Sequence, residues 1–160
     1  MSTDTYITFD GIEGESHDDQ HRGAIEVLSW SWGVTNSPPS SGSGAGRGQG
    51  KATAGELHFM HVYDKASPVL AKKSVQGVHI RTAVLTTRRS GEGQRDFLMI
   101  TLSDVLVTSI SVLGAQDDRL SEAVSLAYGA IEVGYKPQDA AGGLGGEVRF
   151  KWNVKTTEVA

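Results

Sequence analysis

Apolar and polar residues alternate along most of the chain, which is the pattern of strands with one face in a core and one face in solvent. The clearest case lies near the C-terminus, where large apolar residues alternate with charged and polar ones: Val148, Phe150, Trp152 and Val154. We expect these four side chains to point inward. The same period, or a run rich in Val, Ile, Leu and Thr, predicts further strands over residues 24–35, 56–63, 78–89, 95–112 and 122–135.

The first of these predicted strands has two faces of different chemistry. Its apolar positions are expected to bury against a core: Leu28, Trp30, Trp32 and Val34. The positions between them are small and polar, and we expect them to form the opposite face: Ser29, Ser31 and Gly33. The two tryptophans could form a platform for a carbohydrate, but tryptophans that share a strand face with leucine and valine more often belong to a core.

One helix interrupts the predicted strands. Ser67 has the character of an N-cap, Pro68 suits the first helical position, and Gly77 is a natural stop. Between them we expect a buried stripe formed by Leu70, Ala71, Ser74 and Val75. One helix among about seven strands predicts a mainly β fold. A barrel or a sandwich, with the short helix docked on it, is the economical arrangement for a single domain over residues 1–160.

The stretch from Asn36 to Gly50 has a different character, with five glycines, four serines and two prolines. It is long for a connection inside a compact domain, and the segment before it is too short to fold alone. We therefore expect residues 36–54 to form an extended loop that projects from the domain and contacts another molecule. A phosphate-binding loop is disfavoured, because Ala52 follows Gly50-Lys51 where such a loop needs Ser or Thr.

Composition narrows the classes of function. The net charge of −4 argues against a nucleic-acid surface, and we interpret Arg88 and Arg89 as part of a solvated hairpin tip. No apolar run reaches the length of a membrane-spanning helix, and the N-terminal residues do not form a Sec-type signal, so export would need another route. The absence of cysteine excludes disulfides and thiolate chemistry.

Few residues could carry out chemistry. The segment from Glu13 to His21 places His17 and His21 at a spacing that zinc uses on a helix, but the glycines around it argue against a helix. A solvated acidic connection between two strands is the simpler interpretation, and we expect no metal site. His58 and His61 would point to opposite faces of a strand and could not bind a metal together. No nucleophile elbow is present, so we expect no enzyme activity and no cofactor.

Several motifs in this chain occur in an order that resembles one family. They are Gly11-Ile-Glu-Gly-Glu-Ser16, Ile25-Glu-Val-Leu-Ser-Trp-Ser-Trp-Gly33, the glycine-rich loop, Leu57-His-Phe, Asp64-Lys-Ala-Ser-Pro-Val-Leu70, Phe97-Leu-Met-Ile-Thr-Leu-Ser-Asp-Val-Leu-Val107, Asp118-Arg-Leu-Ser-Glu122, Val133-Gly-Tyr-Lys-Pro-Gln138 and Trp152. Together they resemble the haemolysin-coregulated protein (Hcp) family, the inner-tube subunit of bacterial type VI secretion systems. The resemblance covers nearly the whole chain.

The resemblance implies a β-barrel built of two antiparallel sheets with one short flanking α-helix. It also implies a self-assembling structural protein and not an enzyme. Subunits of the family close into homo-hexameric rings, and the rings stack into a tube that meets the sheath and spike proteins of the secretion machine. The lumen of the ring can carry small effector proteins. The resemblance also implies assembly in the bacterial cytoplasm and secretion without a signal peptide, with no nucleic acid and no membrane insertion.

Two sets of site residues follow from the resemblance. The residues implied to face the lumen are Ser29, Ser31 and Gly33. The residues implied to reach the next ring are Asn36, Ser37, Pro38, Pro39, Gly42, Gly44, Gly46, Arg47, Gly48, Gly50 and Lys51. The residues alone leave two alternatives: a monomeric β-barrel that binds a ligand or carbohydrate through the tryptophan pair or the loop, and a metalloprotein built around His17 and His21.

Overall fold

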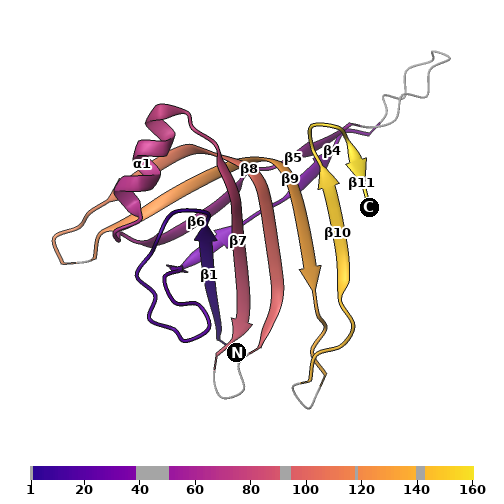
Figure 1. Ribbon diagram of the computed structural model, residues 1–160, viewed down its shortest axis with the longest axis horizontal. Helices are drawn as coiled ribbons and strands as arrows, with labels where there is room; N and C mark the ends of the chain where they lie inside the picture. Colours follow the sequence, from indigo (N-terminus) through magenta and orange to yellow (C-terminus); the bar gives the residue numbers. More distant parts are fainter. Residues whose placement is uncertain (1, 39–50, 91–94, 118, 140–142) are drawn as a thin grey trace.

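A computed structural model of the chain describes residues 2–38, 51–90, 95–117, 119–139 and 143–160 (Figure 1). The described residues form eleven strands and one helix. The longer strands are β1 (Thr3–Phe9), β6 (Leu57–Val62), β7 (Ile80–Arg89), β8 (Asp96–Leu113), β9 (Ser121–Tyr135) and β10 (Val148–Asn153). The shorter elements are β2 (Ile25–Val27), β3 (Ser29–Ser31), β4 (Val34–Asn36), β5 (Ala52–Ala54), β11 (Glu158–Val159) and helix α1 (Ser67–Gln76).

Nine of the described strands form one antiparallel sheet that curls back on itself. One path runs β11-β10-β9-β8-β7-β1-β2, and β6 pairs with both β9 and β3. Strand pairing changes partner at Leu28, between β2 and β3, because β2 pairs with β1 whereas β3 pairs with β6. A backbone hydrogen bond of 2.7 Å from Leu28 N–H to Met60 O spans the break, but the ladders do not close a complete barrel. A second sheet holds β4 and β5, so the predicted mainly β fold of two antiparallel sheets with one helix is confirmed.

The side chains on the inner face of the large sheet form one apolar core. One row crosses five strands through Phe150, Val133, Ile100, Leu85 and Ile7, each opposite the next. All five belong to the core or pack against it. Successive inward positions are two residues apart, which is the period that the sequence pattern predicted.

The inward positions change phase halfway along β8. Leu102 faces the core before the change and Val105 faces it afterwards, with Asp104 between them at a φ of 56°. Gly129 lies opposite on β9, where an added Cβ would stand 3.2 Å from the Cβ of Asp104. A side chain at position 129 would therefore crowd Asp104. The bend lets β8 and β9 cover two sides of the core, and Figure 1 shows both strands curving along their length.

Helix α1 begins differently from the prediction. Ser67 is not the N-cap but a buried first residue of the helix, and Ala66 precedes it in a helical conformation. The Asp64 carboxylate replaces the cap, because its Oδ1 accepts a hydrogen bond of 2.9 Å from Ala66 N–H. The Ser67 hydroxyl oxygen accepts one of 3.1 Å from Asp64 N–H in return. Gly77 ends the helix at a φ of 64°, as predicted.

Several side chains that we expected in the core are exposed. Leu28 and Val34 are 63% and 50% exposed, because the predicted strand over residues 24–35 is divided into β2, β3 and β4, each with a different partner. Val75 on α1 and Val148 on β10 are also exposed. Strands β1, β5 and β11 were not predicted, and β5 lies at the end of residues 36–54, which we expected to form a loop. The prediction that Arg88 lies in a solvated hairpin tip is wrong, because Arg88 is buried.

Candidate functional site

The outer face of β3, β6, β9 and β8 is lined by small polar side chains. Ser31 lies opposite His58, His58 opposite Ser125, and Ser125 opposite Ser109, so these four side chains form one row across four strands. Ser31, His58 and Ser109 are exposed. His58 Nδ1 and Ser125 Oγ lie 2.8 Å apart, and this hydrogen bond holds the imidazole in the row.

A second row lies beside the first on the same face. It contains Ser29, Met60, Ala123 and Ser111, again opposite one another in the four strands. We call the eight residues of the two rows the serine face, because five of them are serines and four of these are exposed: Ser29, Ser31, Ser109 and Ser111. A shallow depression on this face is lined by residues of both rows. Among the eight residues of the serine face, His58 and Met60 have the larger side chains.

Gly33 lies beyond the end of β3, at the base of the hairpin formed by β4 and β5. It lines a second depression together with Ser31 and His58. Gly55 N–H donates to Gly33 O at 2.9 Å, and a Cβ added to Gly55 would stand 2.5 Å from that oxygen. The two ends of the hairpin therefore meet through glycine backbone. Of the three predicted lumen residues, Ser29 and Ser31 share β3 and Gly33 is exposed beside it.

The two tryptophans of this segment pack inward. Trp30 and Trp32 are half-buried against the core, and Trp32 Nε1 donates a hydrogen bond of 2.6 Å to Tyr128 Oη. Tyr128 Oη in turn donates to Gly55 O at 2.7 Å. Burial raises the pKa of Tyr128, so this phenol stays protonated and able to donate. The pair anchors the hairpin base, which favours the core interpretation over a carbohydrate platform.

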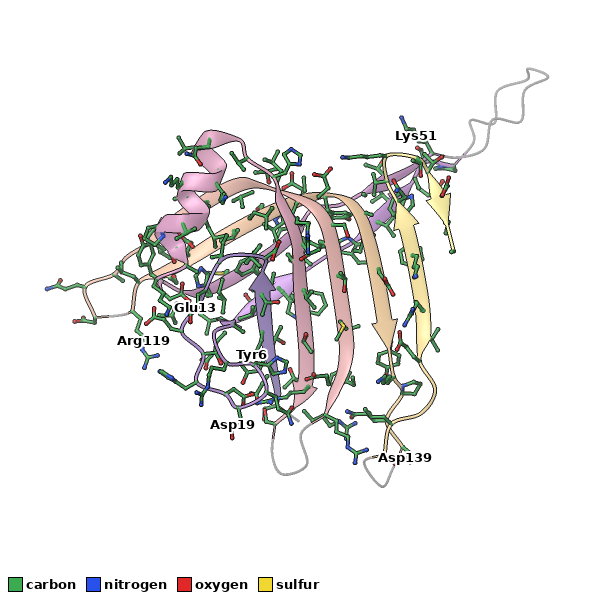
Figure 2. All side chains as sticks on the ribbon, in the orientation of Figure 1. Tyr6, Glu13, Asp19, Lys51, Arg119 and Asp139 are labelled. Carbon is green, nitrogen blue, oxygen red and sulfur yellow. The ribbon has the colours of Figure 1, made fainter. Side chains whose placement is uncertain are left out.

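The β4–β5 hairpin projects from the rest of the sheet. Asn36 lies opposite Ala52, and Ser37 N–H donates to Lys51 O at 3.1 Å beyond the last strand pair. Figure 2 shows Lys51 at the outer end of the hairpin, across the molecule from Arg119. Asn36, Ser37, Pro38 and Lys51 are exposed. The remaining residues predicted for the ring-stacking loop lie outside the described residues: Pro39, Gly42, Gly44, Gly46, Arg47, Gly48 and Gly50.

The histidines near the N-terminus have structural neighbours. His21 stacks on the Tyr6 ring with a centroid distance of 4.5 Å, and its Nε2 lies 3.1 Å from Asp96 Oδ1. His17 is exposed, and the segment between β1 and β2 contains no helix. Among the residues that the structure describes, no group of three His, Asp or Glu side chains could hold a metal ion. As predicted, His58 and His61 point to opposite faces of β6.

Comparison with known proteins identifies the family to which this chain belongs. Residues 6–135 match the family described as type VI secretion system effector, Hcp. The chain belongs to the Hcp family. It is 40% identical over 158 residues to Protein hcp1 of Pseudomonas aeruginosa, with 97% of each chain covered. The predicted family and its place in the type VI secretion system are confirmed.

Solved structures of Hcp proteins have the same fold. A solved type six secretion system protein superimposes with a TM-score of 0.92 at 33% identity, covering 99% of this chain and 100% of that one. Hcp1 from Salmonella typhimurium gives a TM-score of 0.80 at 30% identity, with 100% of both chains covered. In the part of the chain that the structure describes, no helix has the length and apolar character to cross a membrane.

Sequence reasoning found two of the eight residues of the serine face, Ser29 and Ser31. The alternation around Trp30 and Trp32 placed Ser29 and Ser31 on one side, but it could not find their partners. His58, Met60 and Ser125 join the face only through pairing between strands that are distant in sequence. Alternation along β6 did predict that His58 points away from the core. The sequence therefore indicated that His58 faces outward, but it did not reveal the register that places His58 beside Ser31 and Ser125.

Proposed function

We propose that this Hcp is the subunit of a tube, in which six copies close into a ring and rings stack on one another. The observation that carries the proposal is the serine face. An outer sheet face of small hydroxyl-bearing side chains, with few apolar groups, suits the wall of a water-filled channel better than a packed subunit contact. Ring closure needs two different patches that meet around the axis, which a single domain of this size can provide.

In this assembly the serine face lines the lumen. Ser29, Ser31 and Gly33 lie at its edge, next to the base of the hairpin. Hydroxyl groups can exchange hydrogen bonds between water and a guest protein at little net cost. A lumen of this kind can hold small effector proteins through many weak contacts and release them after delivery.

The β4–β5 hairpin is the contact between rings. It leaves the sheet as a separate two-stranded element and carries the predicted stacking residues at its end. The other residues predicted for ring stacking follow the hairpin in the sequence, between Pro38 and Lys51, so we place the contact with a neighbouring ring at this end of the hairpin. In this role the protein has no catalytic residues and needs no cofactor. It assembles in the bacterial cytoplasm inside the sheath and leaves the cell with the spike.

Light scattering after size exclusion tests the assembly. A mass near six times the 17.0 kDa subunit is expected across a wide range of protein concentration. The rival is a monomeric β-barrel that binds a ligand, and a monomer mass at high concentration would support that rival and refute the tube.

The variant Ser31→Gln tests the lumen assignment separately. Glutamine adds bulk to the β3 edge of the serine face without touching the core, since Ser31 is exposed. We expect the variant to form rings as the wild type does, but to retain at least tenfold less of an effector that co-purifies with the wild type. Lys72→Gln, on the exposed side of α1, is the control and should retain the effector normally. Unchanged retention in Ser31→Gln would refute the lumen assignment.

A further inference from the structure

The serine face has two ends of different chemistry. One end borders the base of the β4–β5 hairpin, because Ser31 and Gly33 line the same depression there. At the other end a third row of outward side chains follows the two rows of the serine face. In this row Leu113 lies opposite Ser121, and Ser121 lies opposite Val62. The face therefore changes from small polar to larger apolar side chains at the end away from the hairpin.

Two leucines at this end are exposed. Leu113 on β8 is 65% exposed and Leu28, just before β3, is 63% exposed. Leu28 N–H donates to Met60 O, so the two leucines stand at opposite edges of the same four strands. Leu28 and Val62 line one depression together with Tyr63, which is also exposed. We call Leu28, Val62, Tyr63 and Leu113 the leucine end. Large apolar side chains that gather on a surface are typical of a contact with another protein.

Carboxylates border the leucine end. The depression of Leu28 and Val62 is lined by three carboxylates, one arginine and one histidine: Glu15, Glu26, Asp64, Arg119 and His17. Glu26 is exposed, and Glu15 accepts a hydrogen bond of 2.8 Å from Lys65 N–H, a donor without charge. Carboxylates therefore outnumber cations at this border.

The β4–β5 hairpin has the opposite charge and lies at the opposite side of the molecule. Residues 34–54 include Arg47 and Lys51 and contain no aspartate or glutamate. Figure 2 shows Lys51 at the outer end of the hairpin and Arg119, which lines the depression of the leucine end, across the molecule from it. The two sides of one subunit therefore have complementary charge.

Stacking of identical rings limits which surfaces can meet. In the proposed tube the serine face lines the lumen, so its two ends lie toward the two faces of the ring. If hairpins met hairpins, Arg47 and Lys51 of both rings would repel each other. Contact between a hairpin and the opposite ring face joins unlike patches, so it repeats from ring to ring without closing. The leucine end lies on the side that such a hairpin would reach.

We propose that the leucine end, with Glu15 and Glu26 at its border, is the surface on which the β4–β5 hairpin of a second copy docks. This inference rests on the proposed tube, because the second copy belongs to the next ring. The leucines are removed from water against the exposed Pro38 and Ala52 of the hairpin, and Lys51 lies near the two carboxylates. Docking thus covers the apolar end of the face and leaves the lumen wall polar.

Replacing both leucines tests the apolar part of this contact. We expect the double variant Leu28→Ser, Leu113→Ser to form rings by light scattering but to be secreted at least tenfold less than the wild type. Val75→Ser is the matched control, because Val75 on α1 is 89% exposed and lies on another element. It should be secreted normally. Normal secretion of the leucine variant, or loss of the ring mass in it, would overturn the proposal.

Charge exchange tests the pairing of the two surfaces. Lys51→Glu and Glu26→Lys should each lower secretion at least fivefold, and the two changes together should restore it to within about twofold of the wild type. Both positions are exposed, so the variants should fold and form rings. Glu158→Lys, on β11 at the hairpin's own side of the molecule, is the control and should not restore secretion to Lys51→Glu (Figure 1).

The outcomes separate this inference from the tube itself. A monomer mass for the wild type would refute both. Rings with impaired secretion in Lys51→Glu but normal secretion in Glu26→Lys would leave the tube intact and overturn the leucine end as its docking surface. Restoration by Glu158→Lys instead of Glu26→Lys would overturn it as well, because hairpins would then meet hairpins.

Discussion

At the scale of single residues, Arg88 holds the segment between β1 and β2 on the sheet. Its side chain is 3% exposed, and Nη1 donates to Asp18 Oδ2 at 3.0 Å. Nη2 donates to Tyr6 Oη at 3.1 Å, and the guanidinium lies over the Tyr6 ring. The hydrogen bond from Arg88 holds the pKa of Asp18 below its ordinary value. Figure 2 shows Tyr6 and Asp19 on this side of the molecule.

Removing the charge of Asp18 should destabilise the protein at neutral pH. Asp18→Asn leaves Arg88 buried without its main partner, and we expect the melting temperature at pH 7 to fall by about 5 °C. Because the folded pKa of Asp18 is lowered, its contribution exists above the ordinary aspartate range and is lost as pH falls through the folded pKa. The melting curves of wild type and variant should therefore converge in acid.

The neighbouring residue provides the control for this prediction. Asp19 is 98% exposed at its side chain and lies 4.0 Å from Arg22, an ordinary surface pair. Asp19→Asn should change the melting temperature by less than about 1 °C. Equal effects of the two substitutions, or a difference that persists in acid, would contradict the role given to Arg88.

The role of Arg88 could not be predicted from local sequence. Two adjacent arginines before Ser90 and Gly91 are typical of a solvated turn, and Arg89 fits that pattern better than Arg88. Arg88 is buried because residues distant in sequence, Tyr6 and Asp18, surround it. In contrast, the outward direction of Ser29, Ser31 and His58 follows from alternation alone, since the period of a strand is local.

At the scale of elements, the direction of the β4–β5 hairpin depends on the contact between Gly33 and Gly55. The backbone hydrogen bond between them is 2.9 Å, and the Gly55 position leaves no room for a Cβ. The obstructing atom is a backbone oxygen, which cannot turn aside as a flexible side chain could. A larger residue at position 55 would therefore force the hairpin to a new angle without reaching the core.

The variant Gly55→Ala should disturb stacking more than ring formation. If the hairpin contacts the next ring, its altered angle should lower secretion of the protein by at least tenfold while light scattering still reports rings. Gly33→Ala is the matched control, because a Cβ at position 33 meets nothing within 4 Å. Equal secretion by the two variants would contradict the stacking role of the hairpin.

The elements that alternation and runs of Val, Ile, Leu and Thr predicted best are the longer strands that follow the β4–β5 hairpin in the chain. Strands β6 to β10 were all found, although their ends shifted by a few residues. Strand β1 was missed even though Thr5, Ile7 and Phe9 alternate as buried residues. The division of residues 24–35 into three strands was not visible, because the break at Leu28 is set by which strand pairs with which.

At the scale of the whole molecule, the sheet is bent by two positions that local patterns do not reveal. Asp104 adopts a positive φ, and Gly129 lies opposite without a Cβ. Together they turn β8 and β9. On one side of the turn the two strands lie in the sheet beside β7 and β1, and on the other side they lie beside β6. The bend thus separates the serine face from the rest of the sheet surface. The strand pattern of the sequence predicted a barrel or sandwich, but not the position at which the sheet bends.

The central claim is that the serine face lines the lumen of a six-membered ring. The chain contains no cysteine, so a single introduced thiol can carry one gold label per subunit. Electron microscopy of rings labelled at Ser31→Cys should show six-fold rings with gold density inside the central pore. Rings labelled at Lys72→Cys, on the exposed side of α1, should show gold away from the pore. Gold from Ser31→Cys on the outer rim, or particles without a pore, would contradict the account.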